Sequence, residues 1–237
     1  MRIRLRYGKL GKVRFTSHRD VARIWERALR RARVPLAYSE GFSPRPRVSF
    51  GLALSTGYES MGEYLDVDLD PTGPEVDVAS LPGLLSPLLP EGIDVQAACA
   101  VSRSEPSLQQ VVTSCTWLID VIGTAPAEAA DVVHRALAAP TLVLTRERKG
   151  KAVTDDLRPD LVALRVVGPA DDGTRLEAEL GTQPRTLRPA ELLAALDPPL
   201  TEGRVCRTHQ WLTRDGARRE PLPAGATDAP HACERAS

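Results

Sequence analysis

The hydrophobic period changes once within the first thirty-three residues, and that change limits the folds open to the chain. Residues 2–7 alternate arginines with Ile3, Leu5 and Tyr7, the period of two that is typical of a strand. Residues 18–33 instead repeat apolar positions at intervals of three and four, which indicates an amphipathic helix. Ser17 or Thr16 precedes that run, with Asp20 following, which is an N-cap pattern. We therefore expect a fold of mixed strands and helices, with arginines on the solvent side of both elements.

The rest of the first half predicts four more elements. Alternating apolar residues indicate strands at 48–54 and 63–69 that pair antiparallel, and a third strand at 93–101. Residues 78–89 read as a short helix despite their prolines. The order strand, helix, strand, strand, helix, strand is the split arrangement called ferredoxin-like. We expect an α+β domain of this βαββαβ type over residues 1–105.

The second half repeats this order with one extra strand. Strands are predicted at 114–122, 142–148, 161–167, 174–180 and 204–212, and helices at 126–139 and 189–196. We therefore expect a second ferredoxin-like domain over residues 106–213, in tandem with the first and also with an antiparallel sheet. Residues 214–237 are rich in glycine, alanine, proline and charges, which predicts a disordered tail.

Charge is separated along the chain, although the chain as a whole is neutral. The first fifty residues contain 14 Lys or Arg and 3 Asp or Glu, a local charge of +11 (14 − 3). Residues 51–105 contain ten acids and only Arg103 as a base, a local charge of −9 (1 − 10). A basic surface attracts a polyanion such as RNA, or an acidic protein. A second interpretation stays open, in which the basic face pairs with the acidic segment of the same domain.

Several protein classes lack support in the sequence. The four cysteines, Cys99, Cys115, Cys206 and Cys233, are isolated, with no CxxC pair, so we expect reduced thiols, no metal and no iron–sulfur or other cofactor. No Walker loop, HExxH or GxSxG motif is present. No 18-residue apolar span and no signal-peptide core occur, which predicts a cytoplasmic protein without a membrane partner. The sequence does not indicate an oligomeric state.

The loop around residues 39–47 is the sharpest signal for nucleic-acid binding. Pro44 and Pro46 favour an extended backbone that would present Arg45 and Arg47, while Phe42 could stack on a base. The alternative is that Phe42 and Phe50 both fill the core and the arginines lie along an edge. The predicted RNA-binding residues on the helix, the loop and the second domain are Arg23, Arg27, Arg30, Arg31, Phe42, Arg45, Arg47, Lys149, Lys151 and Arg158.

His18 raises the alternative of catalysis. A histidine can act as general base on a ribose 2′-hydroxyl, and Tyr38 could stabilise the phosphorane, so metal-free RNA cleavage is chemically feasible. The simpler interpretation is that His18, beside Ser17 and Asp20, supports the start of the helix. We therefore predict no catalytic residue, with His18 and Tyr38 as the pair that the alternative would use.

Several phrases together resemble one protein family. They are RF, Ser17, His18, x, Asp20; the RALRRA helix; YSEGFSPRPRVSF; GYES followed by GEYLDV; and KGKAVTDDLRP. Over about residues 1–212 the chain resembles a family of uncharacterised bacterial proteins that are encoded beside, or fused to the C-terminus of, a radical SAM enzyme. Arg19 and Arg45 depart from the usual family pattern, which has an apolar residue and a histidine there, and both add positive charge. A more distant, fold-level likeness is to the CRISPR repeat-processing endoribonucleases.

The resemblance implies a radical SAM protein as partner, and the charge pattern implies RNA. We therefore expect a noncatalytic RNA-binding accessory protein that acts with a radical SAM enzyme, in RNA modification. Two alternatives stay open: a metal-free endoribonuclease that uses His18, and a module whose basic helix docks on an acidic patch of the radical SAM partner.

Overall fold

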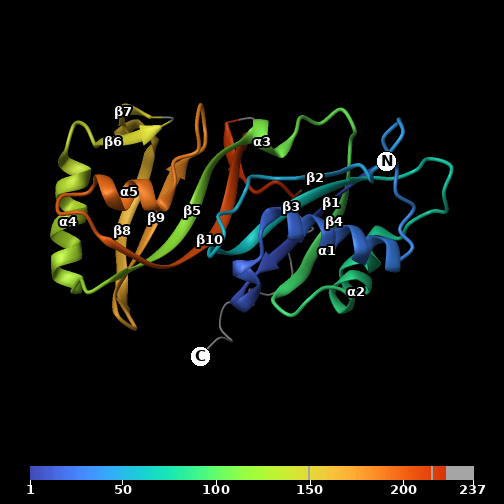
Figure 1. Cartoon of the computed structure of the whole chain (residues 1–237), viewed down its shortest axis with the longest axis horizontal. Coiled ribbons are helices and arrows are strands. Elements are labelled where there is room, and N and C mark those ends of the chain that lie inside the picture. The colour runs from blue at the N-terminus through green and yellow to red at the C-terminus, as the bar shows by residue number, and fades with distance from the viewer. Residues whose placement is uncertain (149, 215, 223–237) are drawn as a thin grey trace. The chain divides into compact units, whose positions relative to one another are not determined.

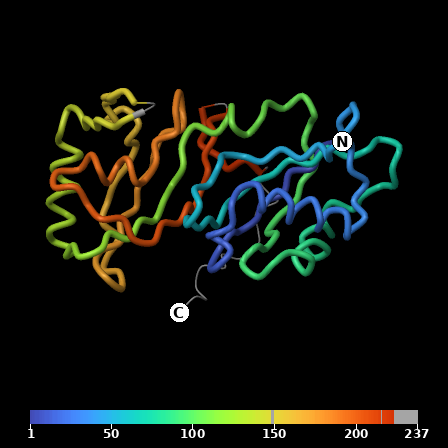
Figure 2. Tube along the Cα trace, in the orientation of Figure 1, coloured from blue at the N-terminus to red at the C-terminus, as the bar shows by residue number. Residues whose placement is uncertain are grey.

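A computed structural model gives the structure of residues 1–148, 150–214 and 216–222. The chain divides into two compact units, which we call unit 1 and unit 2. Unit 1 comprises Met1–Val111 together with Glu220–Ser237, of which residues 220–222 are described, and unit 2 comprises Val112–Arg219. The chain leaves unit 1 after Val111 and returns to it at Glu220 (Figure 2). None of the helices among these residues has the length and apolar character needed to cross a bilayer.

Unit 1 contains the six elements that the sequence predicts, in the predicted order (Figure 1). They are β1 (Arg2–Lys9), α1 (His18–Arg31), β2 (Val48–Phe50), β3 (Glu59–Asp68), α2 (Leu81–Leu85) and β4 (Ile93–Val101). Short 3-10 turns at Gly11–Phe15, Val78–Ser80 and Ser86–Leu88 and a one-turn helix α3 (Leu108–Val111) complete the unit. The sheet runs in the order β4-β1-β3-β2, and every neighbouring pair is antiparallel.

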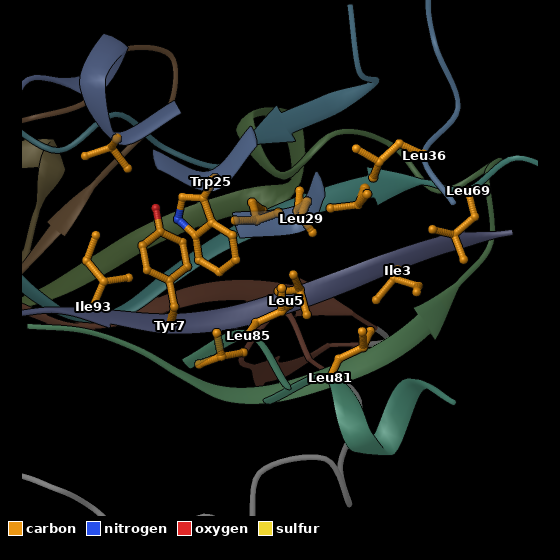
Figure 3. Packing of buried hydrophobic residues seen from close by; sticks show 14 of the residues in the cluster. Ile3, Leu5, Tyr7, Trp25, Leu29, Leu36, Leu69, Leu81, Leu85 and Ile93 are labelled. Carbon is orange, nitrogen blue, oxygen red and sulfur yellow. The ribbon is translucent and has the colours of Figure 1, made fainter. Parts of the chain in front are cut away.

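The main core of unit 1 lies between the sheet and its helices. Ile3, Leu5 and Tyr7 point to this side of β1, as their period of two predicts, and pack with Trp25 and Leu29 of α1. The rings of Tyr7 and Trp25 meet edge to face with centroids 4.9 Å apart (Figure 3). Trp25 is 0% exposed, so the amphipathic pattern of α1 is confirmed by what it buries.

The other side of the same sheet is covered as well. A smaller apolar cluster there contains Tyr64 of β3 and Ala97 of β4, and Leu108 of α3 and Leu222 pack against them. The helix α3 and the returning residues 220–222 therefore cover much of the face on which the sequence placed solvent. Sequence periodicity could not show this, because Leu222 is more than a hundred residues from either strand.

Unit 2 has the same succession of main elements. They are β5 (Val112–Ile122), α4 (Pro126–Ala138), β8 (Leu161–Ala170), β9 (Gly173–Gly181), α5 (Pro189–Ala195) and β10 (Thr201–Arg214). The sheet order is β10-β5-β9-β8, again with antiparallel neighbours. Counted along each unit, the main strands therefore lie in the order 4-1-3-2 in both units.

Two parts of unit 2 differ from the sequence prediction. The predicted extra strand is half of a hairpin, in which β6 (Val143–Arg148) pairs antiparallel with β7 (Lys151–Asp156) outside the main sheet. The disordered tail was predicted to begin at residue 214, but a short strand β11 (Ala217–Arg219) pairs with the end of β10. The tail prediction is thus wrong for its first residues, because this strand and Leu222 find partners that composition does not reveal. Residues 223–237, with Cys233, lie outside the described residues.

Candidate nucleic-acid interface

The helix α1 is fixed at its start by a side-chain cap. The Ser17 hydroxyl accepts the backbone N–H of Asp20 at 3.2 Å and donates to the Asp20 carboxylate at 2.7 Å. This hydrogen bond holds the pKa of Asp20 below its ordinary value. The predicted N-cap is therefore confirmed, and the helix ends at Arg31, two residues before the predicted end.

Four arginines form one row along the exposed side of α1. Arg19, Arg23, Arg27 and Arg31 follow one another at intervals of four residues, so neighbours lie about 6 Å apart along the helix axis. All four side chains are exposed, and the guanidinium of Arg23 forms an ion pair with the Asp20 carboxylate at 3.3 Å. In the described part of the chain, Arg27 and Arg31 form no ion pair with an acidic side chain. The predicted basic face of the helix is thus present as a row of guanidinium groups.

The loop of residues 39–47 is tied at its base and open at its tip. The Ser39 N–H donates to the Arg45 carbonyl, and the Ser39 hydroxyl accepts the Arg45 N–H at 3.0 Å. Beyond this base, Gly41 has a φ of +119°, a conformation that side chains disfavour, and Phe42 is fully exposed. Arg45 and Arg47 are also exposed. The alternative that Phe42 fills the core is therefore wrong, although Phe50 does pack against the core.

The helix row and the loop approach one another at one end of unit 1. The strand β1 runs from Met1 toward Lys9, and α1 returns, so the C-terminal end of α1 lies near the Met1 end of the sheet (Figure 1). The loop is anchored at the same end, because the N–H of Ala37 donates to the Asp68 carbonyl and Leu69 bonds Met1. Arg31 thus lies toward the end of unit 1 that carries the loop.

The arginines of β1 have a different environment, and the prediction that they form a solvent face is wrong. Arg4 is 2% exposed, and its guanidinium donates two hydrogen bonds to Asp66 of β3 at 2.7 and 2.9 Å. It also donates to the Pro221 carbonyl at 3.1 Å. Burial alone would lower the pKa of Arg4, but the hydrogen bonds and the charge of Asp66 outweigh it and raise the pKa.

The neighbours of Arg4 on the same strand are paired too. Arg2 donates to Asp68 at 2.8 Å, and Arg6 contacts Glu220 and Gln96. These acids come from the acidic segment and from the returning chain. The interpretation that basic and acidic segments neutralise each other therefore holds for β1 and does not hold for α1.

His18 is exposed and lies at the edge of a small cavity. Its ring meets the ring of Phe50 edge to face, with centroids 5.2 Å apart. The cavity beside it has a volume of about 20 Å³, room for about one water molecule, and Lys9 and Glu63 also line it. The Lys9 ammonium donates to the carbonyls of Arg14 and Thr16, which fixes the turn before α1. These contacts give this corner a structural role.

The structure does not bring the two residues of the catalytic alternative together. Tyr38 forms an isolated bridge with Pro46 and is exposed. Within the described ranges, no hydrogen bond or ring contact joins Tyr38 to His18.

The three residues of unit 2 that were predicted to bind RNA differ in their environments. Lys151 is exposed on β7. Arg158 is half-buried and donates to the backbone carbonyls of Leu137, Ala139 and Leu161, so its guanidinium is occupied within unit 2. Lys149 lies outside the described residues. Arg158 is therefore a structural residue that closes the end of α4.

One exposed aromatic residue was missed by the sequence reasoning. Phe15 is exposed at the end of the 3-10 turn, and the Arg14 guanidinium lies 4.6 Å from its ring centroid. The only sequence signal is the pair Arg14–Phe15 directly before the helix cap, a basic residue next to an aromatic one. The turn instead leaves the ring in solvent, close to the start of the arginine row.

Comparison with known proteins places the chain in a bacterial family. No curated protein matches its sequence. Residues 2–189, well over half of the chain, match the model of the family described as an uncharacterized protein conserved in bacteria, DUF2344, and the chain therefore belongs to that family.

Proposed function

We propose that this protein binds single-stranded RNA without cutting it, and that it presents the RNA to a radical SAM enzyme for modification. The observation that carries the proposal is the row of exposed arginines on α1, together with the exposed tip of the loop at Phe42. The role of a radical SAM partner rests on the sequence resemblance described above. Both partners would place the protein in the cytoplasm.

The charge that remains after internal pairing favours a polyanion. Residues 18–47 contain eight arginines against Asp20, Glu26 and Glu40, a local charge of +5 (8 − 3). Like charges four residues apart on a helix repel one another. A phosphate chain along the row would relieve this repulsion and release its own condensed counterions. The helix is about 21 Å long, which matches a strand of several nucleotides rather than one small anion.

The exposed aromatic residues favour single-stranded RNA. Unpaired bases stack on exposed aromatic rings, each contributing about 1–3 kcal/mol, and this contact tolerates any base. Phe42 lies on the loop that carries Arg45 and Arg47, so a base and its flanking phosphates would meet the ring and the guanidinium groups together. Phe15 offers a second ring before the start of α1.

The tandem ferredoxin-like assignment is part of this proposal. Each unit has the antiparallel 4-1-3-2 strand order, with helices between the first and second and between the third and fourth main strands. That order and connectivity support the assignment of both units to the βαββαβ plan.

The central experiment combines charge reversal with a salt titration. Arg27→Glu with Arg31→Glu should weaken binding to a single-stranded RNA and reduce the slope of log affinity against log salt by about one for each lost phosphate contact. The matched control is Arg165→Glu with Arg219→Glu, two exposed arginines of unit 2 that give the same change of net charge. Equal losses in both variants, or RNA binding that ignores salt, would contradict the proposal.

A second measurement separates RNA from an acidic protein surface. If α1 instead docks on the radical SAM partner, the α1 variant will lose the partner in pull-down experiments while RNA affinity stays unchanged. Retained partner binding with lost RNA binding supports the proposal.

A third measurement tests the noncatalytic part of the proposal. His18→Ala should leave RNA affinity within about twofold, because the ring packs on Phe50 outside the arginine row. The parent protein should leave RNA intact with chelator present. Cleavage to a 2′,3′-cyclic phosphate that disappears in His18→Ala would establish the endoribonuclease instead.

A further inference from the structure

A second basic site lies in unit 2, at a hollow in front of α5. The hollow has a volume of about 410 Å³ and is lined by Arg146 of β6 and by Arg185, Thr186, Arg188 and Glu191. The helix α5 contacts β6 there, so the loop before α5 and the hairpin form the walls. Three guanidinium groups and one hydroxyl on one small hollow form a donor set that suits an anion.

Carboxylates hold two of these arginines in fixed positions. Glu191 accepts hydrogen bonds from Arg146 at 2.9 Å and from Arg185 at 2.9 and 3.1 Å. Arg146 also donates to Asp155 of β7 at 2.5 Å. Because each guanidinium carries five N–H donors, neither arginine is saturated by these bonds. The acids thus order the guanidinium groups before any ligand arrives, which lowers the entropy lost on binding.

Positive charge exceeds negative charge around the hollow. Arg188 is exposed, and within the described residues it forms no ion pair. On the hairpin, Arg146 lies opposite Val153, so alternation places Lys151 at a register position on the same face. The three arginines that line the hollow, Arg146, Arg185 and Arg188, face the two acids Asp155 and Glu191, a local charge of +1 (3 − 2).

We propose that this hollow binds a phosphate group, which Arg185 and Arg188 hold together with the hydroxyl of Thr186. Planar guanidinium groups bind phosphate with paired hydrogen bonds, and an ordered pair of arginines is the arrangement that such recognition needs. The identity of the molecule that carries this phosphate rests on the proposed function. It is either the bound RNA, through a phosphate of its backbone, or a free nucleotide. The site itself does not use α1 or the loop of unit 1.

The first test uses pyrophosphate as probe with the full-length protein. Pyrophosphate should raise the melting temperature of the parent and bind in calorimetry, and Arg188→Gln should weaken this binding about tenfold, as expected for losing a charge-assisted hydrogen bond. Arg188 is exposed, so this variant should fold normally. The matched control Arg165→Gln removes an exposed arginine that pairs with Glu177 on another part of unit 2 and should bind pyrophosphate as the parent does.

The second test identifies the bearer and keeps the two proposals separable. With single-stranded RNA, Arg188→Gln should weaken binding further in the Arg27→Glu, Arg31→Glu background if the site holds a strand phosphate. If adenosine monophosphate binds and RNA affinity does not depend on Arg188, the bearer is a free nucleotide. No pyrophosphate binding by the parent, or equal binding by Arg188→Gln, overturns the phosphate site. If the parent protein does not bind single-stranded RNA, the proposed function is wrong, and the pyrophosphate measurement still tests the phosphate site.

Discussion

The arginines of β1 and the arginines of α1 come from neighbouring stretches of the chain and reach opposite environments. Arg4 is 2% exposed and held by Asp66, whereas Arg27 extends from the helix into solvent. Both lie on the polar side of an amphipathic element. What separates them is whether another part of the chain covers that side. The helix α3 and residues 220–222 cover the β1 face, while no segment among the described residues covers the arginine row of α1.

This difference shows where net charge along a sequence stops being a guide to surface charge. The acids that neutralise Arg2 and Arg4 lie on β3, about sixty residues later, and are brought opposite by the antiparallel register Arg2↔Asp68 and Arg4↔Asp66. The α1 row has no neighbouring strand to supply such partners. The arginines of β1 are therefore poor candidates for ligand contact, and those of α1 are better ones.

The largest effect is expected from breaking the buried pair. Arg4→Met leaves Asp66 buried without its guanidinium partner and should reduce the free energy of unfolding by about 3–5 kcal/mol. Denaturant unfolding measures this loss. Arg4→Met combined with Asp66→Leu should recover most of it, since apolar pairs replace buried ion pairs well. An unchanged unfolding midpoint for Arg4→Met would contradict the view that the β1 arginines, unlike those of α1, are needed for stability.

The two phenylalanines near the loop provide the next contrast. Phe50 packs against the core and against His18, and Phe50→Ala should cost about 2 kcal/mol, less than a fully buried aromatic residue. Phe42 is fully exposed, and Phe42→Ala should shift the melting temperature by less than about 2 °C. Thermal melts of the two variants side by side check this order. A large drop in the melting temperature of Phe42→Ala would show that the loop has a structural role.

The cap of α1 comes third in size. Ser17→Ala removes the side-chain acceptor for the Asp20 N–H and should cost about 1 kcal/mol in chemical unfolding. Ser43→Ala, on the exposed loop tip, is the control and should be neutral. A neutral Ser17→Ala would mean that packing of Trp25 alone holds the start of the helix.

The β1 region also predicts a loss of stability at alkaline pH. Burial raises the pKa of the Cys99 thiol to about 11, more than the positive charge of Arg4 lowers it. The unfolded thiol ionises first, so this contribution is present below about pH 9 and is lost as the pH rises toward 11. Because the site is only half-buried, the loss should be at most about 1 kcal/mol. The free energies of unfolding of the parent and of Cys99→Ala, measured across this pH range, should approach one another as the pH rises. A constant difference between them would contradict the raised pKa of Cys99.

The smallest effect has the opposite sign. Arg27 lies four residues from both Arg23 and Arg31, so Arg27→Ala removes two repulsive pairs and should raise stability by about 0.5 kcal/mol at low salt. The gain should vanish in 1 M salt, where the screening length is about 3 Å. Melting curves at both salt concentrations test it. A destabilised Arg27→Ala would show that the row has an internal partner.

The elements of both units could be predicted because each has a strong period and clear boundaries. Ser17 marks the start of α1, and the alternation of Ile3, Leu5 and Tyr7 marks the core side of β1. The hairpin partner β7 was missed because residues 151–156 have few apolar positions, so no period reveals a strand.

The candidate site could be predicted only in part, because exposure depends on distant residues. The exposure of the α1 row and of the loop can be predicted from local sequence. The cap at Ser17 and the apolar stripe of α1 determine which side of the helix is exposed, and Pro44 and Pro46 favour an extended loop. The burial of Arg4 depends on Pro221 and Asp66, and the hollow at Arg185 depends on Glu191 and on a hairpin forty residues away. Apart from the contact of Arg185 with Glu191, which are six residues apart, no short window of the sequence contains those contacts.

The return of the chain to unit 1 sets an order for its synthesis. Glu220, the partner of Arg6, and Leu222 are made only after the 108 residues (219 − 111) of unit 2. At ribosomal rates of roughly 5–20 residues per second, residues 1–111 wait about 5–20 s for them. A nascent chain stalled after Arg219 should therefore be more open to proteases in unit 1 than in unit 2. The core that holds α1 uses only residues 3–98 and lies on the other side of the sheet from these late contacts, so we expect the basic row of α1 to form before the second face of the sheet is covered.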